Sequence, residues 1–515
     1  MEQPVSVLTS GGRSRLPLYA LTIFLSSAGL MALEIAAARL LAPYIGVSLY
    51  SWTAIIGVIL GGLSLGNWIG GVWADMDADE RGVGWTLAVG GLACIGILLM
   101  LTLVAPVLQA SELGLLTVSF IFVAALFFIP AVLLGIVTPV LTTLALRLDG
   151  RTGHVVGMMH ALAAFGSILG TFSTGYILVQ YFGTQAIIIG TGVMLGLLAL
   201  VFLWQAWRSI GSLLLLGLFI SGITASRDGF TRFCDRETNY FCIRVVDMSD
   251  EVTYGTLRGM VLDHLMHGIN HREYPTLLMS PYVHLMDELI QSHAKRLDGR
   301  ALRGFFSGGG AYTQPRAIRA RFPDADLVIA ELDPAVTEEA QRKMFYDASK
   351  DRVYHADGRK VLSQMVPDYF DVIVGDVFHD IAIPHHLVTR EYNELVKSRL
   401  NTNGIYVLNV VDASPDPRLV KSIVKTLKST FPNVQIWLEE WSEKHQRQTY
   451  VIAAGSAPIL SDKVHSEHGL KREWQEVSHY LANSGTSFDA LPVLTDDYAP
   501  VESLLSQLIF GSLAR

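Results

Sequence analysis

The N-terminal part of this chain of 515 residues lacks lysine and has few charges of either sign. Residues 1–226 contain 7 Arg and 8 Asp or Glu, whereas residues 227–515 hold 71 of the charged residues. The first part is therefore typical of a membrane-embedded segment and the second of an ordinary soluble domain. This split excludes a purely soluble enzyme and a disordered chain.

Cysteine is scarce, and a basic run is missing. The three cysteines Cys94, Cys234 and Cys242 form neither a zinc pattern nor a disulfide framework. Cys234 and Cys242 can still pair with each other if they face an oxidising compartment. The net charge of −8 without a basic run argues against nucleic acid as a partner.

Long apolar stretches predict a multi-span membrane domain that has the lipid bilayer as its partner. A stretch of roughly 18 or more apolar residues is long enough to cross a membrane as a helix. Six stretches qualify, at residues 17–38, 50–73, 84–106, 115–146, 154–178 and 184–206. A seventh, at 210–225, has 16 residues and is marginal. Glycines at helical spacing, such as Gly66, Gly166 and Gly170, predict close helix packing.

From about residue 229 the pattern changes to short strands that alternate with helices. Residues 232–262 predict a small β-rich region. Strands are expected at 301–307, 327–332, 352–355, 370–374, 405–411, 434–438 and 449–454. Such alternation predicts a parallel, doubly wound sheet. The expected domains are thus a helical membrane domain at 1–226, a linker and small β region at 227–299, and an α/β domain at 300–515.

Glycines and acidic residues follow the predicted strands at the places where an α/β sheet binds ligands. Ligands of such sheets lie beyond the carboxyl ends of the strands. Glu331, Asp357 and Asp376 end the second, third and fourth strands, and the first is followed by Gly308, Gly309 and Gly310. This arrangement predicts a nucleoside site. The alternative is that the acids only cap helix N-termini, as Asp often does.

The glycine turn does not match the phosphate-binding motifs. Residues 308–313 lack GxGxxG because Thr313 stands where the last glycine is needed, and no GxxxxGK[ST] occurs in the chain. A ligand without phosphates therefore fits better than a nicotinamide dinucleotide or ATP. S-adenosylmethionine and its decarboxylated form are such ligands.

These motifs resemble those of the spermidine synthase (polyamine aminopropyltransferase) family, within the class I methyltransferase-like, Rossmann-like fold. The whole chain resembles the bacterial membrane-fused members. The matching stretches are EIAAARLLAPYIG at 34–46, GIVTP at 135–139, SGGGA at 307–311, AELD at 330–333, ADG at 356–358, FDVIVGD at 370–376, LVTREYNELVKSRL at 387–400 and TDDYAPVE at 495–502.

The resemblance implies a role for each matching residue. Glu331 would bind the ribose, Asp357 with Gly358 the adenine, and Asp376 would be the catalytic residue that positions or deprotonates the attacking amine. The glycine turn would approach the nucleoside, which serves as a co-substrate rather than a permanently bound cofactor. No metal is expected, because His379, His385 and His386 near Asp376 match no metal-site spacing.

The departures from the family concern the acceptor side. Ala311 replaces an acidic residue after the glycine turn, and His379 replaces a second one after Asp376. In the small β region, His264 follows Leu262-Asp263, and His267 lies near the position of a family glutamine. A polycation needs carboxylates, so the sequence predicts a degraded polyamine site and poor use of putrescine.

The function expected from the sequence is that of a membrane transferase. It would transfer an aminopropyl group to a small-molecule acceptor, nominally a polyamine. The alternatives are methyl transfer from S-adenosylmethionine, cleavage of S-adenosylmethionine, and a transporter or sensor that binds the nucleoside without turnover. Formation of a homo-oligomer stays open.

The expected location is the inner (plasma) membrane with a cytoplasmic catalytic domain. Arginine bias places the N-terminus inside. Arg227, Arg232 and Arg236 after the seventh stretch favour the same side for the catalytic domain, as does the cytosolic origin of the nucleoside. A spanning seventh stretch would place that domain on the other side.

Overall fold

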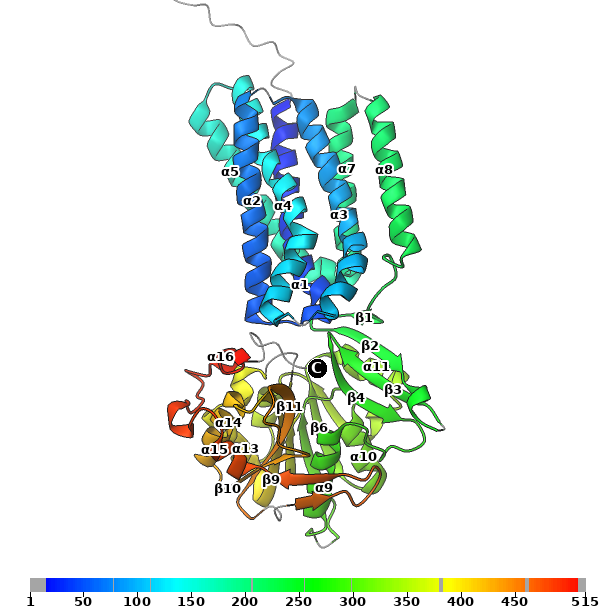
Figure 1. The fold of residues 1–515 in the computed structure, drawn as a ribbon, viewed down its shortest axis with the longest axis vertical. Coiled ribbons are helices and arrows are strands. Elements are labelled where there is room, and N and C mark those ends of the chain that lie inside the picture. The colour runs from blue at the N-terminus through cyan, green and yellow to red at the C-terminus, as the bar shows by residue number, and fades with distance from the viewer. Residues whose placement is uncertain are drawn as a thin grey trace, which may run out of the picture. The chain divides into compact units, whose positions relative to one another are not determined.

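The computed structural model divides the chain into two compact units, Met1–Phe233 and Cys234–Arg515, each of which is described by itself (Figure 1). The domain limits expected at residues 226 and 299 remain proposals. The structure describes residues 15–76, 78–111, 113–204, 207–253, 255–297, 299–378, 383–458 and 463–507.

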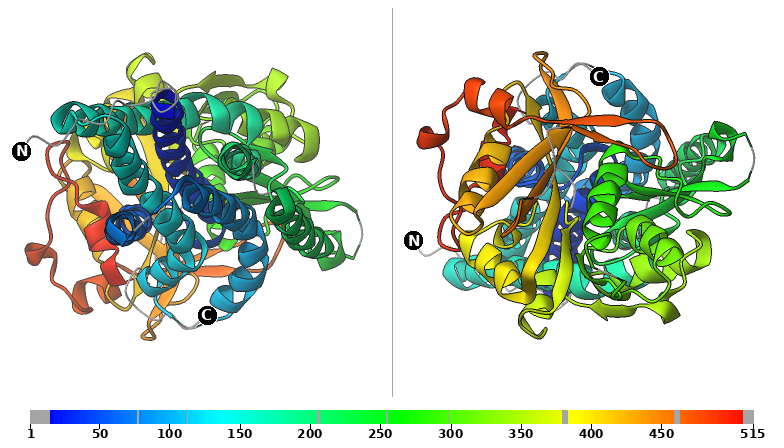
Figure 2. Two further views of the ribbon diagram at one scale, coloured as in Figure 1. Left: turned by 90° about the horizontal axis from the view of Figure 1, so that it is seen from above. Right: turned by 90° about the horizontal axis from the view of Figure 1, so that it is seen from below.

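The first unit is a bundle of helices that run side by side (Figure 1, and along the helices in Figure 2, left). The predicted apolar stretches form helices long enough to cross a membrane, six of them among the described residues. The elements are α1 Leu16–Ile45, α2 Leu49–Met76, α3 Glu80–Gln109, α4 Leu115–Leu148, α5 Thr152–Ser173, the π-helical turn η2 Thr174–Leu178, α6 Val179–Phe182, α7 Thr184–Leu203 and α8 Trp207–Ser226. The predicted multi-span helical domain is confirmed in this sense.

Glycines set the closest helix contacts of the bundle, as their spacing predicted. A Cβ atom on Gly66 of α2 would lie 2.2 Å from the Val132 carbonyl oxygen of α4. Similar additions on Gly166 and Gly170 of α5 would lie 2.2 and 2.3 Å from carbonyl oxygens of α1. No side chain larger than hydrogen fits there, so the backbones touch directly.

Helix α8 returns the chain along the bundle. Its 20 residues correspond to about 30 Å at 1.5 Å per residue, but its apolar part, Gly211–Ser226, is shorter than the six candidate spans. After it, the Thr231 carbonyl accepts a hydrogen bond of 2.9 Å from Gln185, at the start of α7. The Phe233 ring lies 5.1 Å from the ring of Tyr44, at the end of α1. The last residues of the unit thus lie at the end of the bundle opposite the start of α1.

The second unit begins with a small antiparallel sheet in the order β1-β2-β3-β4. Its strands are β1 Arg236–Glu237, β2 Cys242–Asp247, β3 Leu257–Leu262 and β4 Leu265–His271. A disulfide joins Cys234 to Cys242, the pairing that the sequence left open. The predicted small β region is therefore present, with β4 as a strand that the sequence analysis did not list.

The larger sheet has nine strands in the order β12-β13-β10-β11-β9-β8-β5-β6-β7. The strands are β5 Arg303–Ser307, β6 Asp326–Glu331, β7 Arg352–His355, β8 Phe370–Gly375, β9 Leu400–Ser414, β10 Asn433–Leu438, β11 Gln446–Gly455, β12 Lys463–His465 and β13 Glu473–Glu476. The helices are α9 Pro281–Ala294, α10 Thr313–Arg321, α11 Pro334–Lys343, α12 Gly358–Ser363, α13 Arg390–Arg399, α14 Arg418–Lys428, α15 Ser478–Asn483 and α16 Val501–Leu504.

The sheet is mixed, which corrects the expectation of a wholly parallel one. Strands β5 to β9 pair in parallel, whereas β11 pairs antiparallel with β9 and with β10. The segment between β10 and β11 is short and contains no helix, so it can only make an antiparallel return. The expected α/β, methyltransferase-like fold is confirmed for the parallel part.

Candidate functional site

The candidate site lies beside β5, where the chain first adds strands on one side of the sheet and then on the other. β5 is central, with β6 and β7 on one side and β8 and β9 on the other. The carboxyl ends of these strands meet at one edge, and the reversal next to β5 is the place where α/β sheets bind ligands. The glycine turn and all three predicted acids follow strands at this edge.

The glycine turn is shaped by close contact between the ends of β5 and β8. The amide of Asp376 donates to the Ser307 carbonyl at 3.1 Å. Gly308 has φ +90°, and a Cβ added to it would lie 2.1 Å from the Asp376 carbonyl oxygen. Both the positive φ and the contact require glycine at this position. The turn therefore brings Asp376 directly against the start of the loop.

Glu331 holds the glycine turn from the end of β6. Its Oε2 accepts from the amides of Gly309 at 2.9 Å and Gly310 at 3.3 Å, and its Oε1 accepts from Asp333 at 2.9 Å. The side chain is only 5% exposed, and burial raises its pKa, while the three amides oppose that rise. Carboxylate oxygens have further lone pairs, so Glu331 can still accept hydrogen bonds from ribose hydroxyls.

Asp376 is a partly buried carboxyl with a raised pKa. Burial raises the pKa to about 6, a hydrogen bond from Asn409 on β9 opposes the rise, and the charge of Glu331 adds to it. A carboxyl with this pKa is mostly ionised at neutral pH and is still a better base than an exposed one. Asp376 can therefore accept a proton at the strand edge.

Asp357 caps a helix and also contacts a histidine. Its Oδ1 accepts from the Lys360 amide of α12 at 3.0 Å, and its Oδ2 lies 2.7 Å from His386 Nε2. Asp357 thus caps a helix N-terminus, as the alternative interpretation of the acids proposed. It still lies at the strand edge. The neighbouring Gly358 lies against Ser307, whose Oγ would be 2.7 Å from an added Cβ.

Strand β4 of the small sheet packs against the glycine turn. Asn270 donates to the carbonyl oxygens of Ala311 at 2.8 Å and Met344 at 2.9 Å. A Cβ on Gly310 would lie 3.3 Å from the carbonyl oxygen of His267, which belongs to β4. The small sheet therefore contributes a wall next to the predicted nucleoside site.

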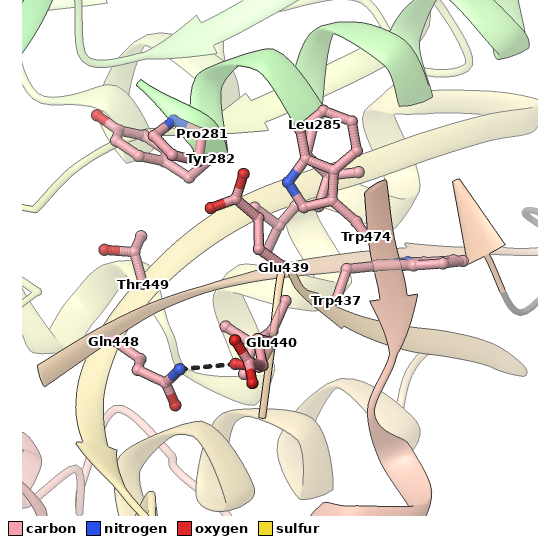
Figure 3. A pocket seen from close by; sticks show the side chains of 11 residues that line it. Pro281, Tyr282, Leu285, Trp437, Glu439, Glu440, Gln448, Thr449 and Trp474 are labelled. Carbon is pink, nitrogen blue, oxygen red and sulfur yellow. Dashed lines mark hydrogen bonds between the residues drawn. The ribbon is translucent and has the colours of Figure 1, made fainter. Parts of the chain in front are cut away.

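An acidic and aromatic pocket of about 200 Å³ adjoins the strand edge (Figure 3). Helix α9 supplies Pro281, Tyr282 and Leu285, and the antiparallel strands with their flanks supply the rest: Trp437, Leu438, Glu439, Glu440, Gln448, Thr449, Val451 and Trp474. In Figure 3 the Glu439 carboxylate points into the space between Tyr282 and Trp474. Arg472 Nε lies 3.5 Å from a Glu439 oxygen and partly neutralises it.

Tyr282 connects this pocket to Asp376. The pKa of the Tyr282 hydroxyl is raised well above its ordinary value by burial and by the negative charge of Asp376. The pocket is therefore within electrostatic reach of the candidate base.

Sequence reasoning found the glycine turn and the three acids but missed Glu439, Glu440, Tyr282 and Asn409, and it considered His386 only as a possible metal ligand. Glu439 and Glu440 follow β10 as the predicted acids follow their strands, so the strand-end rule would have found them. Tyr282, Asn409 and His386 reach the site through tertiary contacts that no motif marks. His379, which stands in place of a family acid, lies outside the described residues.

Among the described residues, no group of three or more His, Cys, Asp or Glu side chains is arranged to hold a metal ion.

The comparisons with known proteins point to one domain family. Residues 319–439 match the family model of the spermine/spermidine synthase domain. The chain is 26% identical over 228 residues to a probable polyamine aminopropyl transferase of Bifidobacterium longum, covering 41% of this chain and 50% of that protein. It is 32% identical over 110 residues to a polyamine aminopropyltransferase of Vibrio vulnificus, covering 21% and 36%. The chain thus spans half or less of these relatives.

Solved structures with a similar chain include a probable spermidine synthase from Corynebacterium glutamicum, with a TM-score of 0.44 and 19% identity, covering 53% of this chain and 99% of that chain. Spermidine synthase from Thermotoga maritima has a TM-score of 0.30 and 15% identity, covering 44% and 75%. The family match at 319–439, with the two relatives, confirms the resemblance seen in the sequence.

The contact at Gly308 gives a testable prediction. Gly308→Ala must shift the Asp376 backbone, because the added Cβ would lie 2.1 Å from its carbonyl oxygen. Gly299→Ala is the matched control, since Gly299 also has positive φ, +80°, but has nothing within 4 Å of an added Cβ. We expect Gly308→Ala to lower the melting temperature and nucleoside binding clearly more than Gly299→Ala. Equal effects would show that the contact does not matter.

Proposed function

We propose that this chain is a membrane-embedded transferase that moves an aminopropyl group from decarboxylated S-adenosylmethionine to an amine. The observation that carries the proposal is the position of Asp376. It lies at the strand edge against the glycine turn, and its charge acts on Tyr282, which lines an acidic, aromatic pocket. The family match at residues 319–439 supports the same reaction class.

The reaction is a displacement at carbon. The nitrogen lone pair of the amine attacks the methylene carbon beside the positively charged sulfur. The carbon–sulfur bond breaks, its electrons stay on sulfur, and the nucleoside leaves as the neutral thioether methylthioadenosine. An acceptor amine is protonated near neutral pH, so one proton passes to Asp376 before attack and frees the nitrogen lone pair. The product nitrogen then carries the positive charge that sulfur loses. Sulfur needs no acid in order to leave, so one carboxyl group suffices.

The nucleoside side of the site is assigned to the glycine turn and two acids. Glu331 already orients the turn and retains lone pairs for two ribose hydroxyls. Asp357 and Gly358 would face the adenine, and Gly308, Gly309 and Gly310 would let the ligand approach the backbone. These assignments rest on the strand-end geometry and on the family resemblance.

The acceptor side is assigned to the pocket around Glu439. Trp437, Trp474 and Tyr282 provide aromatic walls, which favour a cation, and Glu439 with Glu440 provides carboxylates. Because Arg472 partly neutralises Glu439, the pocket offers less than two full negative charges. We therefore retain the expectation that putrescine is a poor acceptor, and we assign the pocket to a cationic amine that has an apolar part.

For the location, the contacts after α8 and the disulfide support the side of the membrane opposite the N-terminus. Helix α8 carries the chain back along the bundle, and arginine bias keeps the N-terminus inside. The Cys234–Cys242 disulfide is stable in oxidising compartments. We propose that the second unit faces outwards from the cytosol, in contrast to the sequence expectation. The donor nucleoside then has to cross the membrane to reach it.

The role of Asp376 can be tested by Asp376→Asn. The variant keeps the shape of the side chain but cannot accept the proton. We expect product formation by the full chain to fall by at least a hundredfold, within the usual range for loss of a general base. Methylthioadenosine binding, followed by calorimetry, should change less than threefold. Loss of binding with unchanged turnover of the bound fraction would contradict the assignment.

The pH dependence follows from the same carboxyl. Because the pKa of Asp376 is raised to about 6, the active ionised form is lost as pH falls through 6. Turnover with both substrates saturating should fall about tenfold per unit below pH 6, while methylthioadenosine binding stays level there. A rate that stays constant down to pH 4.5 would show that no carboxyl with this pKa acts in turnover.

The acceptor pocket can be tested by Glu439→Gln. Removing one charge-assisted contact to a cationic amine costs about 1.5–3 kcal/mol, which is roughly ten- to a hundredfold in KM for the amine. The KM for the nucleoside should not change. Glu394→Gln, on the exposed face of α13, is the control. An unchanged amine KM in Glu439→Gln would remove this pocket from the acceptor site.

The location can be tested by protease treatment of spheroplasts that express the full chain with an N-terminal tag. We expect protease to remove the second unit from the outside and to leave the tag intact. Protection of residues 234–515 would instead restore the cytoplasmic placement.

A further inference from the structure

The segment 494–498, which we call the C-terminal strap, binds α12 and the start of α13, next to the proposed nucleoside site. Asp496 accepts two hydrogen bonds of 2.7 Å from Arg359 of α12 and one of 2.7 Å from Thr389, the residue before α13. The Leu494 carbonyl accepts from the Arg390 amide at 2.8 Å. The strap includes part of the TDDYAPVE motif, to which neither catalysis nor nucleoside binding has given a role.

Arg359 extends this network to the loop that carries His386. While paired with Asp496, it also donates to the His386 carbonyl at 3.1 Å. The pairing with Arg359 is the main reason why the pKa of Asp496 is lowered to about 2, so this ion pair persists over the working pH range. The strap therefore fixes the backbone of His386, through Arg359, beside the strand edge.

The imidazole of His386 is hydrogen-bonded to the Asp357 oxygen that a ligand would use. Asp357 Oδ1 is taken by the Lys360 amide as the cap of α12, at 3.0 Å. Oδ2 is the other oxygen, and His386 Nε2 lies 2.7 Å from it. Both side chains are 37% exposed, so this contact lies at the accessible surface rather than in the core.

We propose that His386 competes with the base of the nucleoside for Asp357 and that the C-terminal strap holds it in the competing position. This proposal rests on the proposed function, in which Asp357 accepts from the amino group of the base. On binding, the base amino group replaces Nε2 at Oδ2. His386 is thus a specificity-determining residue, because only a base that donates to Asp357 can displace it.

The test measures methylthioadenosine binding to the full chain in detergent by calorimetry. His386→Phe keeps a ring but removes the donor, so binding should tighten about three- to tenfold, the range that one hydrogen bond accounts for. His386→Gln retains an N–H donor and should stay near the wild-type affinity. His385→Phe is the control, since the ring of His385 contacts that of His386 at 5.7 Å but has no bond to Asp357 among the described contacts.

Asp496→Asn should also free Asp357 from His386. It weakens the ion pair that positions Arg359, which in turn donates to the His386 carbonyl. It should also tighten binding, and the double variant Asp496→Asn/His386→Phe should bind no tighter than His386→Phe alone. Additive effects would show that the strap and His386 act separately and would overturn the link between them.

The outcomes separate this proposal from the proposed function. Wild-type binding that is unchanged or weakened in His386→Phe overturns the competition and leaves the nucleoside site standing. Binding by neither the wild type nor any His386 variant overturns both. Binding that appears only after His386→Phe supports the competition most strongly.

Discussion

The site depends on the direct contact between the backbone after β5 and the backbone after β8. Gly308 leaves no room for a side chain beside the Asp376 carbonyl, and Glu331 binds the next two amides of the same turn. One carboxylate and one glycine thus define both the floor of the proposed nucleoside site and the position of the candidate base. Because parallel strands align their carboxyl ends, every acid that follows these strands reaches the same edge.

Burial raises the pKa of both carboxyl groups at this edge, but their hydrogen-bond partners differ. Glu331 receives three amide hydrogen bonds, which oppose the rise in its pKa and hold the glycine turn. At Asp376, burial and the negative charge of Glu331 raise the pKa to about 6, and only the hydrogen bond from Asn409 opposes this rise. We therefore assign different roles to the two acids, which follow the strands on either side of β5, because their hydrogen-bond partners differ.

Local patterns in the sequence predicted the parallel strands, the glycine turn, Glu331, Asp357 and Asp376, since each follows a strand that is visible in the apolar pattern. They did not predict the antiparallel half of the sheet, because pairing direction depends on which distant strands meet. For the same reason the acidic pocket around Glu439 and the contact of His386 with Asp357 were not anticipated. Helix α8 was uncertain because its apolar run is short, and its course was set by contacts of Thr231 and Phe233 with the bundle.

In the proposed function, the strand edge transfers a group from a sulfonium nucleoside to an amine. The most direct measurement is mass spectrometry of the products formed by the purified full chain with decarboxylated S-adenosylmethionine and a mixture of amines. We predict methylthioadenosine together with an equal amount of one aminopropylated amine. Methylthioadenosine without such an amine, or no nucleoside product at all, would contradict the claim.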